Sequence, residues 1–168
     1  MLDTEGFRLN VAIILVNHQD KVLLAKRIKQ NAWQLPQGGV NDNENLLDAL
    51  YRELYEEIGL NDKDVSVIAS TKHWLSYKLP VRMRRKGEPL FVGQKQRWFL
   101  LRFNGEDHQI RFDLSSKPEF DAWQWVNYWY PLHMVIDFKR QVYCRALREL
   151  STYIYNNRKY NKLDHICR

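Results

Sequence analysis

The segment 8–16 constrains the fold most strongly, because it is rich in β-branched residues and contains an apolar run from Val11 to Val16. This composition predicts a buried β-strand. Turn-forming residues follow at 17–20, and the segment 21–27 returns as a second apolar strand, so the two segments predict a hairpin. The apolar run is far shorter than the ~20 residues that cross a bilayer. We therefore expect a sheet-forming chain with no membrane partner.

Helices and further strands follow the hairpin without a regular strand–helix–strand repeat. We expect these strands at 33–35, 65–73, 74–79, 94–103 and 123–126. One expected helix covers 44–58 and stops at Gly59, and a final helix begins with Asp137 as its N-cap. The buried face expected for the final helix comprises Phe138, Val142, Ala146, Leu150 and Tyr153. Such a mixture predicts an α/β sandwich, in which a mixed β-sheet is flanked by helices.

The length of 168 residues fits a single domain. Asp3 and Glu5 give the first residues the wrong charge for a secretory signal peptide. Two cysteines, Cys144 and Cys167, are too few for a disulfide framework, and we expect free thiols in a reducing compartment. These observations predict a cytoplasmic protein.

Charge is distributed unevenly along the chain. Residues 38–60 contain six acids and one base, a net charge of −5, whereas residues 72–102 contain nine bases and one acid, a net charge of +8. Residues 138–168 contain eight bases and two acids, a net charge of +6. An acidic centre in basic surroundings suits a polyanionic substrate held beside metal cations. Basic faces that are merely solvated would produce the same pattern.

Three glutamates share one face of the helix expected at 44–58. At about 100° per residue, Glu53, Glu56 and Glu57 form a stripe beside the apolar stripe. The apolar stripe comprises Leu47, Leu50, Leu54 and Ile58. Repulsion costs only ~0.2–0.5 kcal/mol per glutamate pair on an exposed helix, so a solvated acidic face remains an alternative.

Clustered carboxylates are also the ligands that Mg²⁺ and Mn²⁺ prefer. Arg52 is spaced to reach Glu56 one turn later and to fix its rotamer. The adjacent glycines Gly38 and Gly39 allow the backbone to approach a metal or a phosphate closely, and a free carbonyl there is a further candidate ligand. We therefore expect a divalent-metal site on this helix.

The same residues match a known motif, the Nudix box G-x5-E-x7-R-E-U-x-E-E-x-G-U, at every defined position. The matching residues are Gly38, Glu44, Arg52, Glu53, Leu54, Glu56, Glu57, Gly59 and Leu60. The chain thus resembles the Nudix superfamily of metal-dependent hydrolases, which act on nucleoside diphosphates linked to another moiety and fold as an α/β/α sandwich. The resemblance implies that Glu53, Glu56 and Glu57 bind the cations, that Arg52 orients these catalytic glutamates, and that the Gly38 carbonyl completes the metal site.

The resemblance implies a structural role for Glu44. Segments outside the box resemble one branch of the superfamily, the bacterial RNA pyrophosphohydrolases, which are near relatives of plant-type diadenosine tetraphosphate hydrolases. The similar segments are 33–39, 72–80, 93–99, 118–123 and 138–143. This likeness predicts one Nudix domain over residues 1–157 and a basic C-terminal tail at 158–168 that frays. The chain has Ala32 where the branch commonly has a hydroxyl residue, which puts one polar contact to the nucleotide in doubt.

The branch also implies residues that touch the substrate. Glu119 resembles an additional metal ligand from outside the box, although on its own it would be an ordinary loop acid. The residues implied to contact phosphates or a base are Arg8, Arg27, Tyr77, Lys78, Ile136, Phe138 and Lys139. Lys139 is also singled out physically, because a cation in the first turn of a helix opposes the macrodipole at a cost of ~0.3–1 kcal/mol. For Arg8 and Arg27 the alternative is a solvated strand end, and the basic segment 82–86 suits either an RNA backbone or solvent.

The function expected from this resemblance is a metal-dependent RNA pyrophosphohydrolase. It would remove pyrophosphate from the 5′-triphosphate end of RNA and so promote mRNA decay, with Mg²⁺ or Mn²⁺ as cofactor and Glu53 or Glu57 as general base. The alternatives are a dinucleoside polyphosphate hydrolase, acting on substrates such as diadenosine tetraphosphate, and a non-catalytic RNA-binding module. We expect no DNA partner, and the sequence indicates no protein partner. It contains no zinc-ligand spacing of His and Cys and no P-loop motif.

Overall fold

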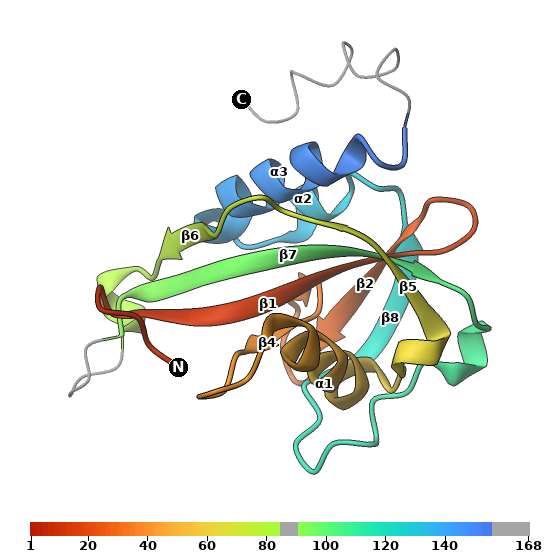
Figure 1. Cartoon of the computed structure of the whole chain (residues 1–168), viewed down its shortest axis with the longest axis horizontal. Coiled ribbons are helices and arrows are strands. Elements are labelled where there is room, and N and C mark those ends of the chain that lie inside the picture. The colour runs from red at the N-terminus through yellow and green to blue at the C-terminus, as the bar shows by residue number, and fades with distance from the viewer. Residues whose placement is uncertain (85–90, 156–168) are drawn as a thin grey trace.

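The computed structural model describes residues 1–84 and 91–155. The strands are β1 (Phe7–Val16), β2 (Val22–Arg27), β3 (Trp33–Gln34), β4 (Gln37–Gly39), β5 (Val65–Ser70), β6 (Leu75–Lys78), β7 (Gly93–Phe103) and β8 (Phe120–Val126). The α-helices are α1 (Leu46–Ile58), α2 (Pro131–Met134) and α3 (Asp137–Ser151). All eight strands join one sheet, with α1 on one face and α2 and α3 on the other (Figure 1). The predicted α/β sandwich is confirmed, whereas the predicted tail at 158–168 lies outside the described residues.

The sheet is mixed, as predicted. Its main path runs in the order β3-β2-β1-β7-β5, and the short strands β4, β6 and β8 pair with β1, β7 and β2 respectively. The predicted hairpin is present, because β1 and β2 pair antiparallel. Strands β1 and β7 pair in parallel along their whole length, which sets Arg8 opposite Gln94 and Asn10 opposite Gln96.

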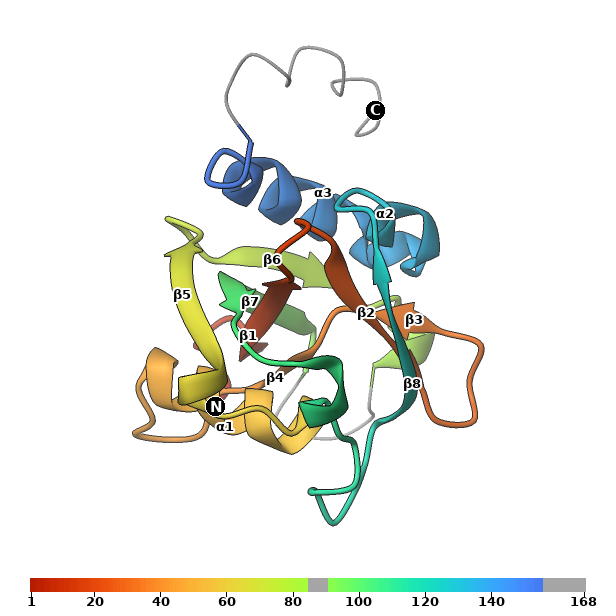
Figure 2. The same ribbon diagram turned by 90° about the vertical axis from the view of Figure 1, so that its right-hand side faces the viewer.

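Alternation along β1 supplies both halves of the hydrophobic core. Val11, Ile13 and Leu15 belong to the core cluster that α1 completes, whereas Ala12 and Ile14 belong to the cluster beneath α3. Because successive side chains point to opposite faces, Arg8 and Asn10 lie on the α3 face of the sheet. Figure 2 shows α1 and α3 on opposite sides of the sheet. None of the described helices is long and apolar enough to span a membrane.

Helix α1 begins and ends at clear capping signals. The Asn45 side chain accepts hydrogen bonds from the backbone of the first turn, and Gly59 ends the helix in the left-handed region at φ 75°. The predicted apolar stripe is wrong at Leu47, which is 48% exposed because its neighbour Leu46 packs against the core instead. The buried face of α1 comprises Ala49, Leu50, Glu53, Leu54, Glu57 and Ile58.

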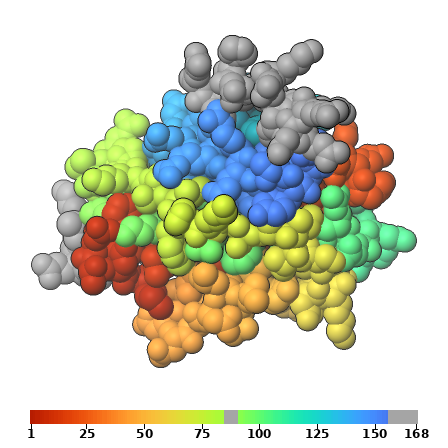
Figure 3. Space-filling view, turned by 45° about the horizontal axis from the view of Figure 1, so that its top comes forward, coloured from red at the N-terminus to blue at the C-terminus, as the bar shows by residue number. Residues whose placement is uncertain are grey.

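Helix α3 departs from the expectation at both ends. Asp137 is its first helical residue, and the N-cap position belongs to Ile136, which makes no capping hydrogen bond with its side chain. Tyr153 lies beyond the end of the helix and is 56% exposed, so it does not belong to the buried face. That face instead packs Tyr143 and Leu147 beside the predicted apolar residues. Figure 3 shows α3 against the segment that carries β5 and β6.

The expectation of a free thiol at Cys144 is wrong. This residue is disulfide-bonded and lies in the core cluster beneath α3. The other cysteine of the chain, Cys167, lies outside the described residues.

Candidate active site

A polar cavity of about 840 Å³ opens at the side of α1, and we call it the carboxylate pocket. The predicted site residues that line it are Arg8, Arg27, Gly38, Arg52, Glu53, Glu56 and Glu119. Elements far apart in the sequence bring these residues together: strands β1, β2 and β4, helix α1, and the segment just before β8. The structure therefore gathers most of the predicted metal site in one place.

Arg52 fixes the orientation of the neighbouring acids. Its guanidinium donates to both carboxylate oxygens of Glu44, at 2.7 and 2.8 Å, and to Glu53 Oε1 at 2.6 Å. It also donates to the Gly39 carbonyl at 2.7 Å. The contact with Glu56 is longer, at 3.4 Å, so the arginine is held chiefly by Glu44 rather than by the helical neighbour expected from spacing. Its planar fork of five N–H donors holds Glu44 in a bidentate contact and reaches Glu53 and the Gly39 carbonyl as well, a geometry that the single ammonium nitrogen of a lysine cannot reproduce.

Gly38 lies directly against the carboxylate of Glu53. A Cβ atom at this position would lie only 1.7 Å from the Cδ of Glu53. Any other residue at position 38 would therefore push the glutamate out of place. The absence of a side chain at Gly38 is what allows β4 and α1 to approach here.

Two of the box glutamates are buried. Glu53 and Glu57 are 8% and 6% exposed, and burial raises the pKa of both carboxyl groups. The negative charge of Glu119 raises both pKa values further, whereas Arg52 counteracts the rise at Glu53. Glu57 accepts a hydrogen bond from the Gln37 backbone N–H at 2.8 Å, and it lies beneath the pocket rather than on its wall. Excess negative charge is thus concentrated where little water can solvate it.

The chemistry of this donor set fits a hard divalent cation. Carboxylate oxygens predominate, and a positive ion would offset both the burial of Glu53 and Glu57 and the negative charges of neighbouring acids, which together raise the pKa of these two groups. In the described residues, no three His, Cys, Asp or Glu side chains are already grouped closely enough to hold a metal. Arg52 and the Gln37 N–H engage the Glu53 and Glu57 carboxylates instead. Binding an ion therefore requires these carboxylates to rotate toward one another.

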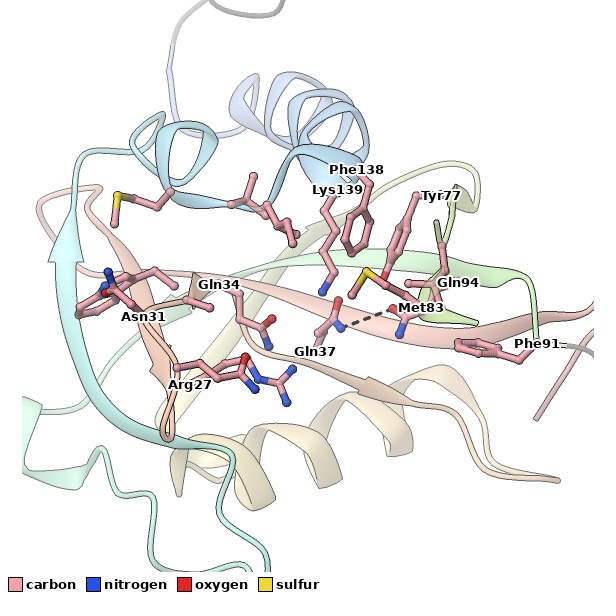
Figure 4. Close-up of a pocket in the computed structure, with 17 residues that line it drawn as sticks. Arg27, Asn31, Gln34, Gln37, Tyr77, Met83, Phe91, Gln94, Phe138 and Lys139 are labelled. Atoms are coloured by element: carbon pink, nitrogen blue, oxygen red, sulfur yellow. Dashed lines mark hydrogen bonds between the residues drawn. The ribbon is translucent and has the colours of Figure 1, made fainter. Parts of the chain in front are cut away.

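A second cavity of about 510 Å³ lies between the sheet and the start of α3, and we call it the α3 pocket. Figure 4 shows Lys139 and Phe138 pointing into it from α3, with Tyr77 beside them and Arg27 across the cavity. The Tyr77 and Phe138 rings are 5.7 Å apart. Ile136 also lines the pocket and is 52% exposed at its rim. Aromatic rings facing an arginine across a cleft can hold a nucleobase between them.

Lys139 is nearly buried, at 9% exposure. Burial lowers the pKa of its ammonium group to about 8, and the positive charge of Arg27 lowers it too. Its Nζ lies 5.7 Å from the centre of the Tyr77 ring, a weak cation–π contact. Within the described residues Lys139 forms no salt bridge, and the charges of Glu119 and Glu57 offset only part of the lowering of its pKa. A buried cation without a carboxylate partner suits an anionic ligand.

Three residues line both cavities and so join them: Arg27, Gln37 and Gln94. Arg27 Nη2 lies 4.0 Å from Glu119 Oε2, at the junction between the pockets. The sequence analysis did not predict Gln37 or Gln94 as site residues. Only their places in the sequence could have indicated them, since Gln37 precedes the glycine pair and Gln94 begins a strand beside basic residues.

One predicted substrate residue is not brought to the site. Lys78 is exposed and lines neither cavity, because it alternates with the buried Tyr77 along β6 and points to the opposite face of the sheet. In the basic segment 82–86, the Arg84 Nε donates to the Leu79 carbonyl at 2.9 Å and so folds back on the chain. Residues 85 and 86 of this segment lie outside the described residues.

The sequence of the chain matches a known protein family and named relatives. The profile of the NUDIX domain matches residues 6–146. The RNA pyrophosphohydrolase of Ectopseudomonas mendocina (strain ymp) is 57% identical over 152 residues, covering 90% of this chain and 96% of the relative. The RNA pyrophosphohydrolase of Pseudomonas paraeruginosa is similar to the same extent.

Solved structures share the fold at low sequence identity. The dihydroneopterin triphosphate pyrophosphohydrolase of E. coli superposes with a TM-score of 0.67 at 19% identity, covering 85% of this chain and 98% of that one. An Ap4A hydrolase of C. elegans gives a TM-score of 0.60 at 14% identity, covering 86% and 97%. The profile match and the 57% identical relatives each span most of the chain. The chain therefore belongs to the NUDIX domain family.

Proposed function

We propose that this protein is a metal-dependent RNA pyrophosphohydrolase, which converts a 5′-triphosphate end of RNA to a 5′-monophosphate. The observation that carries the proposal is the junction of the two cavities. A pocket lined by aromatic, apolar and cationic side chains opens directly into a pocket lined by the box carboxylates, and three residues line both. A nucleotide with a 5′-polyphosphate has a matching layout, with an aromatic base at one end, phosphates at the other end and the sugar between them. The relatives at 57% identity carry the name RNA pyrophosphohydrolase.

Each end of the substrate has candidate contacts in this chain. Arg27 and Phe138 would hold a base between them, with Ile136 at the rim, while Lys139 and Tyr77 would meet its polar groups. Arg8 lines the carboxylate pocket and would bind the phosphates.

The metal site proposed for the reaction consists of Glu53, Glu56, Glu57, Glu119 and the Gly38 carbonyl. When bound, Mg²⁺ or Mn²⁺ supplies charge neutralisation on the polyphosphate and acidifies the attacking water. Glu53 or Glu57 would accept the proton of that water. Both are buried, and burial raises their pKa, which brings a carboxylate closer to the range useful for a general base.

Release of 5′-monophosphate RNA in the cytoplasm would promote mRNA decay, and we place the protein there as part of the proposal. A dinucleoside polyphosphate hydrolase is the second candidate, because the open carboxylate pocket continues past the acids to the exposed Tyr55 and Leu114. These apolar side chains leave room for a second moiety on the far side of the phosphates.

One assay separates the two candidates. The purified chain is incubated with Mg²⁺ and either triphosphorylated RNA or diadenosine tetraphosphate, and kcat/KM is compared. We expect the RNA to be preferred and Glu53→Gln to lower kcat by about 10²-fold or more while RNA binding persists. Preference for diadenosine tetraphosphate would favour the second candidate. Full activity of Glu53→Gln would refute the catalytic assignment, and RNA binding without any turnover by the unaltered protein would indicate a non-catalytic module.

A further inference from the structure

A group of side-chain amides covers the sheet where the two cavities meet, and we call it the amide floor: Asn10, Gln37, Gln94 and Gln96. The strand register explains why they meet. Asn10 lies opposite Gln96 across the parallel β1–β7 pair, and Asn10 also lies opposite Gly39 of β4, the strand that carries Gln37. Side chains two residues apart on these strands share the α3 face.

The hydrogen bonds within the floor engage the oxygen of the Gln94 amide and not its nitrogen. Gln94 Oε1 accepts from Gln96 Nε2 at 3.0 Å and from Gln37 Nε2 at 3.4 Å, the second bond being drawn in Figure 4. Gln96 Nε2 also donates to Gln37 Oε1. With its oxygen engaged twice, Gln94 is oriented so that its NH₂ group has no hydrogen-bond acceptor among residues 1–84 and 91–155. Gln94 is half-buried and lines both cavities.

The floor also leaves two buried acceptors without a donor, Asn10 Oδ1 and Gln96 Oε1, of which only Asn10 Oδ1 belongs to a residue that lines a cavity. Asn10 is 2% exposed and lines the carboxylate pocket, and its Oδ1 has no hydrogen-bond partner in the described structure. A buried acceptor of this kind is unfavourable until a donor reaches it. The floor therefore presents a free amide donor and, on the neighbouring strand, an unpartnered amide acceptor, and both residues line the carboxylate pocket.

This combination fits a hydroxyl group better than a phosphate. A hydroxyl donates and accepts at once, whereas a phosphate oxygen at neutral pH only accepts and would leave Asn10 Oδ1 unpartnered. Between a base in the α3 pocket and phosphates in the carboxylate pocket lies the sugar. In a nucleotide within an RNA chain the 3′ oxygen is esterified, so the 2′-hydroxyl is the free hydroxyl of that sugar.

We propose that Gln94 and Asn10 bind the ribose 2′-hydroxyl of the nucleotide held across the two cavities and thereby select RNA over DNA. This inference rests on the proposed function for its substrate class. Gln94 donates to the hydroxyl oxygen, and the hydroxyl donates to Asn10. Gln37 and Gln96 act as positioning residues, because they orient the Gln94 amide.

The first test changes the substrate and leaves the protein unaltered. Short triphosphorylated RNAs carrying a single 2′-deoxy sugar at nucleotide 1 or at nucleotide 2 are compared with the all-ribose RNA. We expect one of the two positions to lower kcat/KM by roughly 10-fold or more, because the 2′-deoxy sugar loses both hydrogen bonds of the hydroxyl. Equal kcat/KM for all three substrates would overturn the proposal.

The second test asks whether Gln94 is the group that reads the hydroxyl. In Gln94→Leu we expect kcat/KM on all-ribose RNA to fall several-fold while kcat/KM on the 2′-deoxy RNA stays the same, so that the preference for ribose shrinks to the part that Asn10 supplies. The matched control is Gln124→Leu, an exposed position on β8 outside both cavities, which should keep the full discrimination. An equal loss on both substrates with the discrimination intact would mean that Gln94 binds a phosphate, and it would refute the assignment.

A binding measurement separates this inference from the proposed function. Affinities for 5′-monophosphate RNA, all-ribose or 2′-deoxy at the sensitive position, are measured without divalent metal, so that no turnover is involved. A preference for ribose that Gln94→Leu or Asn10→Leu reduces supports the sugar contact even if the triphosphate is not hydrolysed. Equal affinities would contradict the sugar contact, even if hydrolysis proceeds.

Discussion

Lys139→Met tests whether the α3 pocket holds a cation at a cost to the stability of the protein. The lysine is 9% exposed, and burial lowers its pKa from 10.5 to about 8. A methionine has a similar length and no charge, so it removes the unfavourable burial of the ammonium group and keeps the packing against Tyr77.

The magnitude follows from the shift in pKa. A lowering of about 2.5 units at 1.36 kcal/mol per unit corresponds to ~3 kcal/mol, which is an upper limit on the expected gain in stability. The folded state binds this proton less tightly than the unfolded state. The penalty is therefore fully present below pH 8, shrinks as the pH rises from 8 toward 10.5, and vanishes above that range.

Urea denaturation measures the effect at two pH values. We expect Lys139→Met to increase the free energy of unfolding at pH 7 by up to ~3 kcal/mol and to show a smaller gain at pH 10. Arg140→Met is the matched control, because Arg140 is the exposed neighbour on the same helix and should give little or no gain. A variant that is no more stable than the parent at pH 7 would refute the reasoning, since the lysine would then be compensated in the folded protein.

Three further predictions concern catalysis and the support of the site. Lys139→Ala should raise KM for triphosphorylated RNA and reduce its dependence on salt, and an unchanged KM would remove this lysine from the substrate site. Gly38→Ala should lower kcat by about 10²-fold, because its Cβ would displace Glu53, whereas Gly105→Ala, outside both cavities, should leave kcat unchanged. Arg52→Lys should cost roughly 1–3 kcal/mol of stability in urea denaturation as well as activity, because a lysine cannot reproduce the fork to Glu44, and a loss below ~0.5 kcal/mol would contradict this.

The fold was predictable because its local signals agree with its long-range packing. The β-branched run of β1 and the glycine that ends α1 identified a strand and a helix end correctly. The predictions of burial were wrong where tertiary contacts determine whether a side chain reaches the core. Leu47 shares the apolar angle of α1 yet is exposed, and Tyr153 continues the spacing of α3 beyond the point where the helix ends. A helical angle tells which side a residue faces, but not how far the core extends along the helix.

The candidate site was predictable where residues follow a fixed spacing on one element. Glu53, Glu56 and Glu57 share α1, and the motif located them. The amide floor was missed, because its members come from three strands and meet only through the register of the sheet. Lys78 was assigned to the substrate from its segment, whereas the alternation of β6 turns it away from both pockets.

The parallel pairing of β1 with β7 has a consequence for the timing of folding during synthesis. Arg8 stands opposite Gln94, so the ribosome must add more than eighty residues before these two positions can align. Contacts this distant in sequence close late and slowly. A ribosome-bound chain that stops short of β7 would carry Glu53, Glu56 and Glu57 on α1 and still lack the surface that joins the two cavities. Nascent chains should therefore gain the ability to bind substrate abruptly rather than in proportion to their length.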